Sequence, residues 1–469
     1  MDIDKRHPYY KENIEQWKYL NASYVGGKEY RSSEYSMLRK YLDEEGAKST
    51  SYNKRLTYTA LDNLVKVTVD TYRSFLFRTT PIRTFGNQAG NILVNRFQYD
   101  TDLEGKDLND FMRSANDLAM VYGHVWIMVT KGFQEGVITL QQEIEADIRP
   151  YAKLFTPENV IDWKYEKQSN GRNILTRLVT CEEYDEDAYQ YIVWERNSIT
   201  TYVVKEEDGK ETITMTEMQD NPLGVVPFVL LKANDSDDMG VGMSDVEDVA
   251  KTQQAIFNLL SEAEQGIRIS NHPTLAKTRD TSATAGAGSI IDLDPNLDPN
   301  LKPYLLEPSG TNISSIVEMI NIHIESVLRM THLGAIMAAR GLTAKSGIAL
   351  ATEFEMLNVR LGDKAARLEQ AEYAMWELFW KWSNIPQPPE FNIEYHKTFD
   401  LRDEAADLAM YSSALELPIK SATYQRELQK QIAKLVIKNG DALDDIMAEL
   451  DAETFDTGVM TNATQTGIQ

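Results

Sequence analysis

Apolar residues recur at helical spacing in the first part of the chain. The pattern holds between Ile14 and Leu20 and again between Leu61 and Tyr72, before the helix breaker Pro81. From about residue 119 to residue 231 the period becomes two, in short β-branched or aromatic runs separated by polar turns. The predicted strands are 125–129, 136–140, 175–179, 189–194 and 199–204. Because no helical pattern separates successive strands, an antiparallel sheet is expected.

The second half of the chain returns to helical spacing. Ser244 with Glu247 predicts a capping box before a helix of roughly 25 residues, and Ser315 with Glu318 predicts another before a second helix. Between them, residues 272–310 hold five prolines and the strand-like run 289–291. A third helix is expected from Gly347 over about 36 residues, up to the prolines that begin at Pro386.

The aromatic residues of that third helix predict ordinary core packing. They are Phe354, Trp376, Phe379 and Trp380, with Met375 beside them. A strand at 390–395 and further helices from Asp403 to about Ala452 complete the pattern, and the last residues predict a frayed tail. The expected fold class is therefore α+β and mainly helical.

Composition narrows the functional classes. The 48 Lys and Arg residues against 72 Asp and Glu residues give a net charge of −24 across 469 residues, which disfavours a high-affinity nucleic-acid binder. The hydrophobic share of 42% is sufficient for packed cores. One cysteine, Cys181, excludes an intrachain disulfide. No apolar run predicts a signal peptide or a spanning helix, so we expect a cytoplasmic product without a membrane.

The least acidic part of the chain lies between Tyr9 and Asp117. Its basic residues allow two interpretations, a nucleic-acid face or a set of solvated or intersubunit charges, and the second is favoured. They are Lys54, Arg55, Lys66, Arg73, Arg78 and Arg83.

The sequence does not match the known catalytic and cofactor-binding motifs that it partly resembles. Ala344 precedes Lys345-Ser346 where a phosphate-binding loop requires glycine, and Asp245 stands where a dinucleotide fingerprint requires its third glycine. The histidines lack zinc spacing, and Cys181 beside two glutamates is not an activated nucleophile. These failures predict a protein that is not an enzyme and holds no cofactor and no metal.

An acidic run in the proline-rich segment leaves two interpretations open. Asp292, Asp294 and Asp298 alternate as calcium ligands do, but Leu297 and Pro303 stand where a calcium loop requires glycine and glutamate. The run is either a weak divalent-cation site or a turn that carries solvated acids.

The order of these patterns resembles the portal proteins, or head-to-tail connectors, of tailed bacteriophages. The resemblance covers about Tyr9 to Gln431 and is carried by three motifs. They are the N-terminal His7-Pro8-Tyr9-Tyr10, the helix start at Gly240-Val241-Gly242-Met243-Ser244, and the long-helix start at Ser346-Gly347-Ile348-Ala349-Leu350.

The resemblance implies a subunit with wing, stem, clip and crown regions. It divides the chain into an N-terminal helical part of the wing (1–117), the wing's antiparallel β region (118–235), stem helix 1 (236–271), the clip (272–311), stem helix 2 (312–333), the tunnel loop (334–346), a long wing helix with a returning strand (347–400), and crown helices with an acidic tail (401–469).

Site residues follow from these regions as implications of the resemblance. The tunnel loop would place Arg340 and Lys345 at a DNA constriction, with the small residues Ala338, Ala339 and Gly341 beside them. Clip residues that would meet a partner are Asp292, Asp294, Asp298 and Tyr304.

On stem helix 2, Glu318 and Glu325 are seven residues apart on one face, with Arg329 one turn further. They line a DNA channel or are simply solvated. A repulsive acidic lining suits a conduit through which DNA must slide, because each phosphate contact would hold the strand.

The implied function is a homo-oligomeric ring, twelve copies by resemblance, at a unique capsid vertex. Double-stranded DNA would pass through it without sequence specificity during packaging, retention and ejection. The implied protein partners are the large terminase, a neck or tail adaptor, and capsid and scaffold proteins. The subunit would be assembled in the host cytoplasm and reside in the virion. The alternative is an acidic cytoplasmic enzyme whose carboxylate active site the sequence does not identify.

Overall fold

The computed structural model describes residues 5–32, 37–44, 50–132, 140–185, 188–207, 210–271, 274–276, 298, 304–306, 311–334, 347–399, 404–415, 417, 419, 421–437 and 446–450. The chain divides into two compact units, Met1–Phe399 and Asp400–Gln469. The second unit contains the helices α12 (Glu404–Leu415) and α13 (Ala422–Val436), and Ser421 caps the latter by accepting a hydrogen bond from the Tyr424 backbone N–H.

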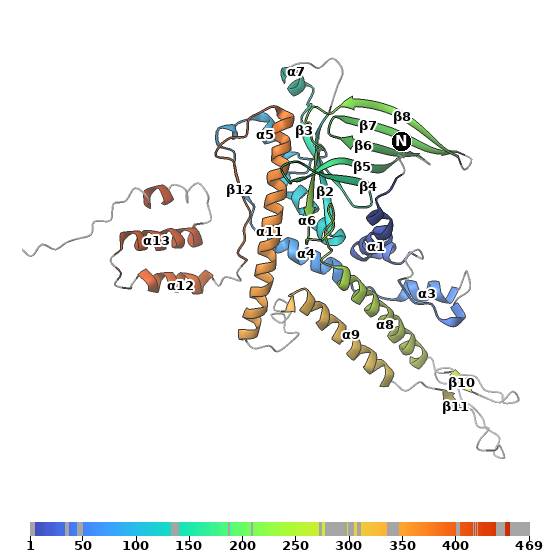
Figure 1. The fold of residues 1–469 in the computed structure, drawn as a ribbon. Coiled ribbons are helices and arrows are strands. Elements are labelled where there is room, and N and C mark those ends of the chain that lie inside the picture. Colours follow the sequence, from blue (N-terminus) through green and yellow to red (C-terminus); the bar gives the residue numbers. More distant parts are fainter. Residues whose placement is uncertain are drawn as a thin grey trace, which may run out of the picture. The chain divides into compact units, whose positions relative to one another are not determined.

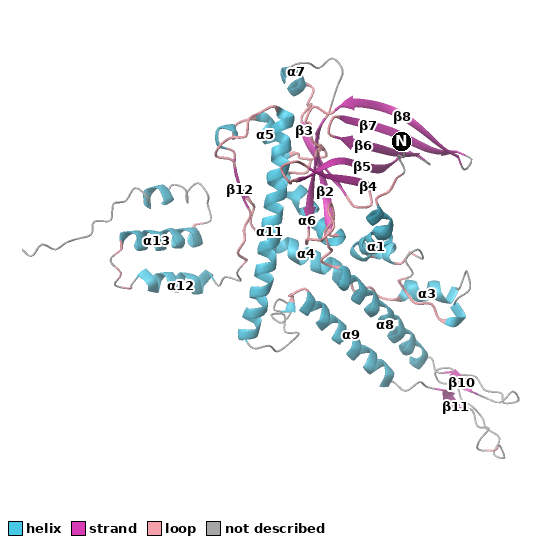
Figure 2. Ribbon diagram, in the orientation of Figure 1, coloured by secondary structure: helices cyan, strands magenta, loops and turns pink. Residues whose placement is uncertain are grey.

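The first unit combines helices with antiparallel sheets (Figures 1 and 2). Its α-helices are α1 (Pro8–Val25), α2 (Gly27–Tyr30), α3 (Thr50–Tyr58), α4 (Leu64–Leu76), α5 (Ile92–Tyr99), α6 (Leu108–Tyr122), α7 (Leu140–Glu145), α8 (Glu247–Asn271), α9 (Thr311–Met330) and α11 (Gly347–Ser383). Its strands are β1 (Ile82–Thr84), β2 (His124–Lys131), β3 (Pro150–Phe155), β4 (Val160–Lys167), β5 (Asn173–Asp185), β6 (Ala188–Glu195), β7 (Ser198–Glu207), β8 (Lys210–Asp220), β9 (Phe228–Lys232), β10 (Thr274–Ala276), β11 (Tyr304–Leu306) and β12 (Asn392–Glu394).

The core of the first unit forms around the sheet β3-β2-β9. Every residue of β2 from His124 to Thr130 is buried, and α6 and α11 both pack on this sheet. Phe354, Trp376, Phe379 and Trp380 of α11 are each 9% exposed or less, and the Trp376 ring lies 5.0 Å from that of Phe97. The prediction that these aromatic residues form ordinary core is confirmed. Burial of such large rings supplies much of the stability of this unit.

A second sheet has the strand order β4-β5-β6-β7-β8, and all of its pairings are antiparallel, as predicted. β8 is an edge strand among the described strands. A register shift beside Thr216 leaves Met215 opposite Tyr202 and Met218 opposite Thr200. This bulge therefore keeps Ile213, Met215 and Met218 on one face, and all three are at least half exposed.

Helix and strand predictions differ in their success. Long helices are placed well, since α11 has 37 residues and ends three residues before Pro386. The expected strand at 136–140 is wrong at its end, because Leu140 begins α7; residues 136–139 lie outside the described part of the chain. The run 289–291 also lies outside it, so that strand stays a prediction. In the same proline-rich segment, β10 and β11 pair as an antiparallel ladder.

Neither predicted capping box forms. α8 begins only at Glu247, whose carboxylate pairs with Lys251 at 2.7 Å instead of turning back to Ser244. α9 begins at Thr311, so Ser315 lies inside the helix and Glu318 is exposed on its surface. Both motifs are short enough to occur by chance inside a helix or before it.

Two of the basic residues predicted as a charged surface are buried in ion pairs. Arg55 contacts Glu44 at 2.6 Å, and Arg83 contacts Glu372 of α11 at 2.5 Å. Tyr395 donates a hydrogen bond to the same Glu372 carboxylate at 2.6 Å, and both burial and that carboxylate hold the pKa of Tyr395 far above its usual range. These arginines connect elements of the fold and are not available to a nucleic acid or to a neighbouring subunit.

Candidate functional site: the root of a helical hairpin

α8 and α9 form an antiparallel hairpin that projects from the rest of the first unit, with the β10–β11 ladder beyond its far end (Figure 1). Near that end, a Cβ atom placed on Gly266 of α8 would lie 3.5 Å from the Ile313 side chain of α9, which is an ordinary van der Waals distance. We call the opposite end, where α8 begins and α9 ends, the root of the hairpin. The chain joins the sheets and α11 to the hairpin at this root, so its contacts decide how the hairpin is held.

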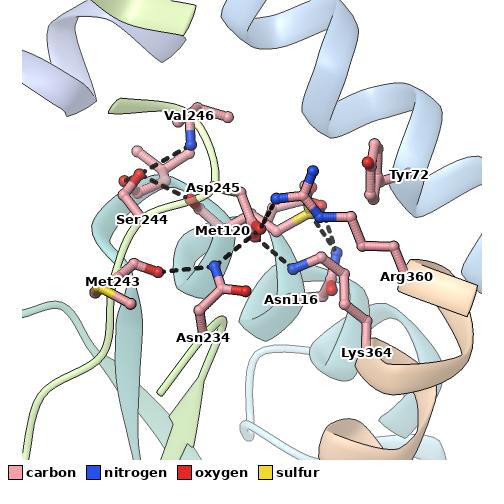
Figure 3. Close-up of polar contacts among 12 residues, drawn as sticks. Tyr72, Asn116, Met120, Asn234, Met243, Ser244, Asp245, Val246, Arg360 and Lys364 are labelled. Carbon is pink, nitrogen blue, oxygen red and sulfur yellow. Dashed lines mark hydrogen bonds and ion pairs between the residues drawn. The ribbon is translucent and has the colours of Figure 1, made fainter. Parts of the chain in front are cut away.

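The start of α8 is held by a buried carboxylate, that of Asp245 (Figure 3). Lys364 of α11 donates a short hydrogen bond to one carboxylate oxygen, and both side chains are about 5% exposed or less. Asn234 donates to the other oxygen at 3.0 Å, and Arg360 of α11 lies 3.7 Å from it. Burial lowers the pKa of Lys364, and the Asp245 carboxylate opposes that effect. A buried charge of each sign is therefore retained only while the two remain together.

The end of α9 is held from two sides. Arg360 donates to the Met330 carbonyl oxygen at 3.1 Å, and Tyr72 of α4 donates to the Thr331 carbonyl oxygen at 2.7 Å. The last carbonyl groups of a helix have no partner within the helix and carry its negative dipole end. A cationic donor and a phenol therefore satisfy groups that would otherwise be left unpaired at a partly buried position.

A direct contact between two backbones fixes the segment before α8. Gly123 has φ +93°, and a Cβ atom placed on it would lie 2.3 Å from the Gly242 carbonyl oxygen. A Cβ atom on Gly242 would lie 2.4 Å from the Gly123 carbonyl oxygen. In the Gly240-Val241-Gly242 run, which failed as a nucleotide motif, Gly242 is required for close packing against the end of α6, and Gly240 lies against Trp163 of β4.

Replacing Gly242 with alanine should strongly destabilise the protein. The added methyl group meets backbone atoms that have no flexible side chain to move aside. We expect a loss of at least ~3 kcal/mol in the free energy of unfolding, measured by denaturant titration. Gly90→Ala is the matched control, because a Cβ atom there meets nothing within 4 Å. Equal stability of the two variants would contradict the close contact.

His124 lies beside this contact and is buried in the neutral form. Its Nδ1 accepts a hydrogen bond from the Gly242 backbone N–H at 3.3 Å, and its ring lies 5.8 Å from that of Trp17 in an edge-on arrangement. Burial, with a smaller contribution from Lys232, lowers the pKa of His124 to about 3. The folded protein therefore binds fewer protons at this site than the unfolded chain below about pH 6.5.

The stability contributed by neutral His124 should be present above about pH 6.5 and should be lost progressively as the pH falls towards 3. His124→Gln keeps an acceptor for the Gly242 N–H but does not titrate. We expect the variant's unfolding free energy to fall less steeply between pH 6.5 and 4.5, by up to ~1.4 kcal/mol per pH unit. Denaturant titrations at several pH values measure this difference, and parallel curves for the two proteins would refute it.

The outer surface of α9 combines acidic and apolar side chains. Glu318, Glu325 and Arg329 are all exposed, and the two glutamates have no ion-pair partner among the described residues. Arg329 donates to Ser326 at 3.3 Å on its own helix. Val317 and Ile322, also on α9, are about half exposed. The predicted stem residues are therefore on the solvent side of the hairpin in the single chain.

Most of the other predicted site residues lie outside the described part of the chain. This applies to Arg340, Lys345, Ala338, Ala339 and Gly341, and to Asp292 and Asp294. Asp298 is described and exposed, and Tyr304 begins β11, where its backbone pairs with Ala276. Tyr304, in the ladder beyond the far end of the hairpin, does not belong to the root. Sequence reasoning missed the residues that do form the root, since Arg360 and Lys364 appear on α11 only as cations four residues apart.

A pocket of about 560 Å³ lies next to the root, between α1, the start of α8 and the end of α9. Its lining mixes aromatic residues such as Tyr9 and Trp17 with Asp245, Asp248 and Arg360. Within the described residues, no group of three or more His, Cys, Asp or Glu side chains is placed to hold a metal ion, and no helix is long and apolar enough to cross a membrane.

Comparison with known proteins gives matches among solved structures. No protein-family model and no curated protein matches this chain by sequence. A chain in the neck of an empty gene transfer agent (GTA) particle computed with C6 symmetry is 8% identical, with a TM-score of 0.45 over 82% of this chain and 94% of that chain.

Two further chains are similar over 78% of this chain and 89% of their own length. One belongs to the virion of a native GTA particle, with 10% identity and a TM-score of 0.43. The other belongs to the neck of a native GTA particle computed with C12 symmetry, with 9% identity and a TM-score of 0.41.

Proposed function

We propose that this chain is a portal-type subunit, which assembles into a ring at a capsid vertex and forms the channel for DNA between head and tail. The observation that carries the proposal is the sequence of elements around the hairpin. A sheet-containing body leads into α8, a short β10–β11 ladder joins α8 to α9, and the 37-residue α11 follows. This order is the one on which the resemblance to phage portals rests.

In this proposal the hairpin is the stem, and the segment that includes the β10–β11 ladder is the clip. The stem would present Glu318 and Glu325 to the channel, where their exposure leaves them available to repel DNA phosphates. The clip, with Asp298 and Tyr304, would meet the terminase during packaging and the neck or tail adaptor afterwards. Residues 334–346 would form the tunnel loop, with Arg340 and Lys345 at the constriction.

Ring formation is the first test. Purified protein should contain closed rings of many hundreds of kilodaltons, about twelve copies of the 53.3 kDa chain by resemblance, in native mass spectrometry and negative-stain images. Antibodies against the chain should also label one vertex of the virion. A protein that stays monomeric or dimeric and is absent from virions would refute the proposal and return attention to an enzyme.

Reversal of channel charge tests the path of DNA. Glu318→Lys with Glu325→Lys should reduce the amount of DNA packaged per particle at least several-fold, because each added lysine attracts phosphate, and higher salt should restore part of it. Glu394→Lys is the control, since this exposed glutamate lies on β12 away from the hairpin. Arg340→Glu should also impair packaging. If these hairpin and loop variants assemble into rings and package a normal amount of DNA, the proposal that DNA passes along these residues is wrong.

A further inference from the structure

We propose that Arg360 and Lys364 clamp both helices of the hairpin, at its root, to one turn of α11, so that the hairpin and α11 move as a single body. The inference concerns mechanical coupling within one subunit, and it holds whether or not the ring of the proposed function forms. Its basis is that the same turn of α11 contacts the segment that begins α8 and the carbonyl group that ends α9.

Arg360 is the bridging residue. One terminal nitrogen, Nη1, donates to the Met330 carbonyl oxygen at 3.1 Å, and the other, Nη2, lies 3.7 Å from the Asp245 carboxylate. The two contacts use different nitrogen atoms of one planar guanidinium, so they span a wider separation than the three donors on the single nitrogen of a lysine. Among the described residues, this side chain joins both the end of α9 and the segment before α8 to α11. Figure 3 shows its position beside Asp245.

Lys364 makes the α8 side of the clamp resistant to opening. It is 5% exposed and Asp245 is 4% exposed, so separating them leaves two charges unpaired in a poorly solvated place. Asp245 is also anchored from its backbone, whose N–H donates to the Met120 carbonyl oxygen of α6 at 3.0 Å. The start of α8 is thus fixed to α6 and α11, and α9 is fixed to α11 and α4.

The two halves of the clamp differ in strength. On the α9 side, Tyr72 donates to the Thr331 carbonyl oxygen and also interacts with Arg360, whereas the Met330 carbonyl depends on the guanidinium, which is 34% exposed. Loss of Arg360 should therefore loosen the end of α9 and weaken the start of α8 without exposing the core. This makes Arg360 a positioning residue whose removal the fold tolerates.

Hydrogen exchange measured by mass spectrometry on the full chain tests the coupling. In Arg360→Gln, amides near Ala250 in the first turn of α8 and near Thr331 after α9 should both exchange at least tenfold faster, while the β4–β8 sheet keeps its protection. Arg113→Gln is the matched control, because this arginine makes an exposed ion pair with Asp110 on α6 and does not contact the hairpin. It should change neither region.

Arg360→Lys separates a clamp from general stabilisation. The lysine should keep the ion pair with the Asp245 carboxylate and lose the hydrogen bond to the Met330 carbonyl oxygen. The amide exchange rate should therefore rise tenfold near Thr331 but less than threefold near Ala250. A uniform rise in exchange rate across the whole first unit in either variant would overturn the proposal. Unchanged exchange at both the start of α8 and the end of α9 would also overturn it. Because the readout is made within one chain, it remains interpretable if no ring is found.

Discussion

The position of the hairpin depends on the buried carboxylate of Asp245. It lies where α6, the segment before α8, and α11 meet, and it is satisfied by Lys364, Asn234 and Arg360. Burying a charge is unfavourable unless its partners are complete, so each of these elements must arrive in one arrangement for the carboxylate to be stable there. Removing one partner would leave the other charge buried and unpaired, so the arrangement that keeps them together is favoured over arrangements that separate them.

α11 makes similar connections at a second position along its length. Near its middle it carries Arg360 and Lys364, and further on Glu372 binds Arg83 from β1 and Tyr395 after β12. One turn beyond Glu372, Trp376 packs in the core against Phe97 of α5 and Phe391 before β12. Polar contacts at a few buried positions determine how α11 is positioned against its neighbouring elements, and apolar packing supplies most of the stabilising free energy.

Whether a feature of the fold or of the hairpin root could be predicted depends on how far apart in the sequence its interacting residues lie. Periodicity identified α11 and the strands β5, β6 and β7, because burial of one face imposes spacing along a single element. It did not identify β4 or β8, and it misjudged Arg55 and Arg83 as surface charges. Ion pairs between residues more than a hundred positions apart, such as Asp245 with Lys364, leave no local pattern. The Gly240–Gly242 run gave a signal, but its reason, a backbone contact with Gly123, needed the fold.

The open side of β8 also affects how the protein can be produced. Its outer backbone groups are unpaired among the described strands, and Ile213, Met215 and Met218 give the same strand an apolar face. Such an edge accepts a further strand from a misfolded copy as readily as from a correct one. Chains that accumulate quickly would therefore have a direct route to aggregation, which favours slow expression at low concentration.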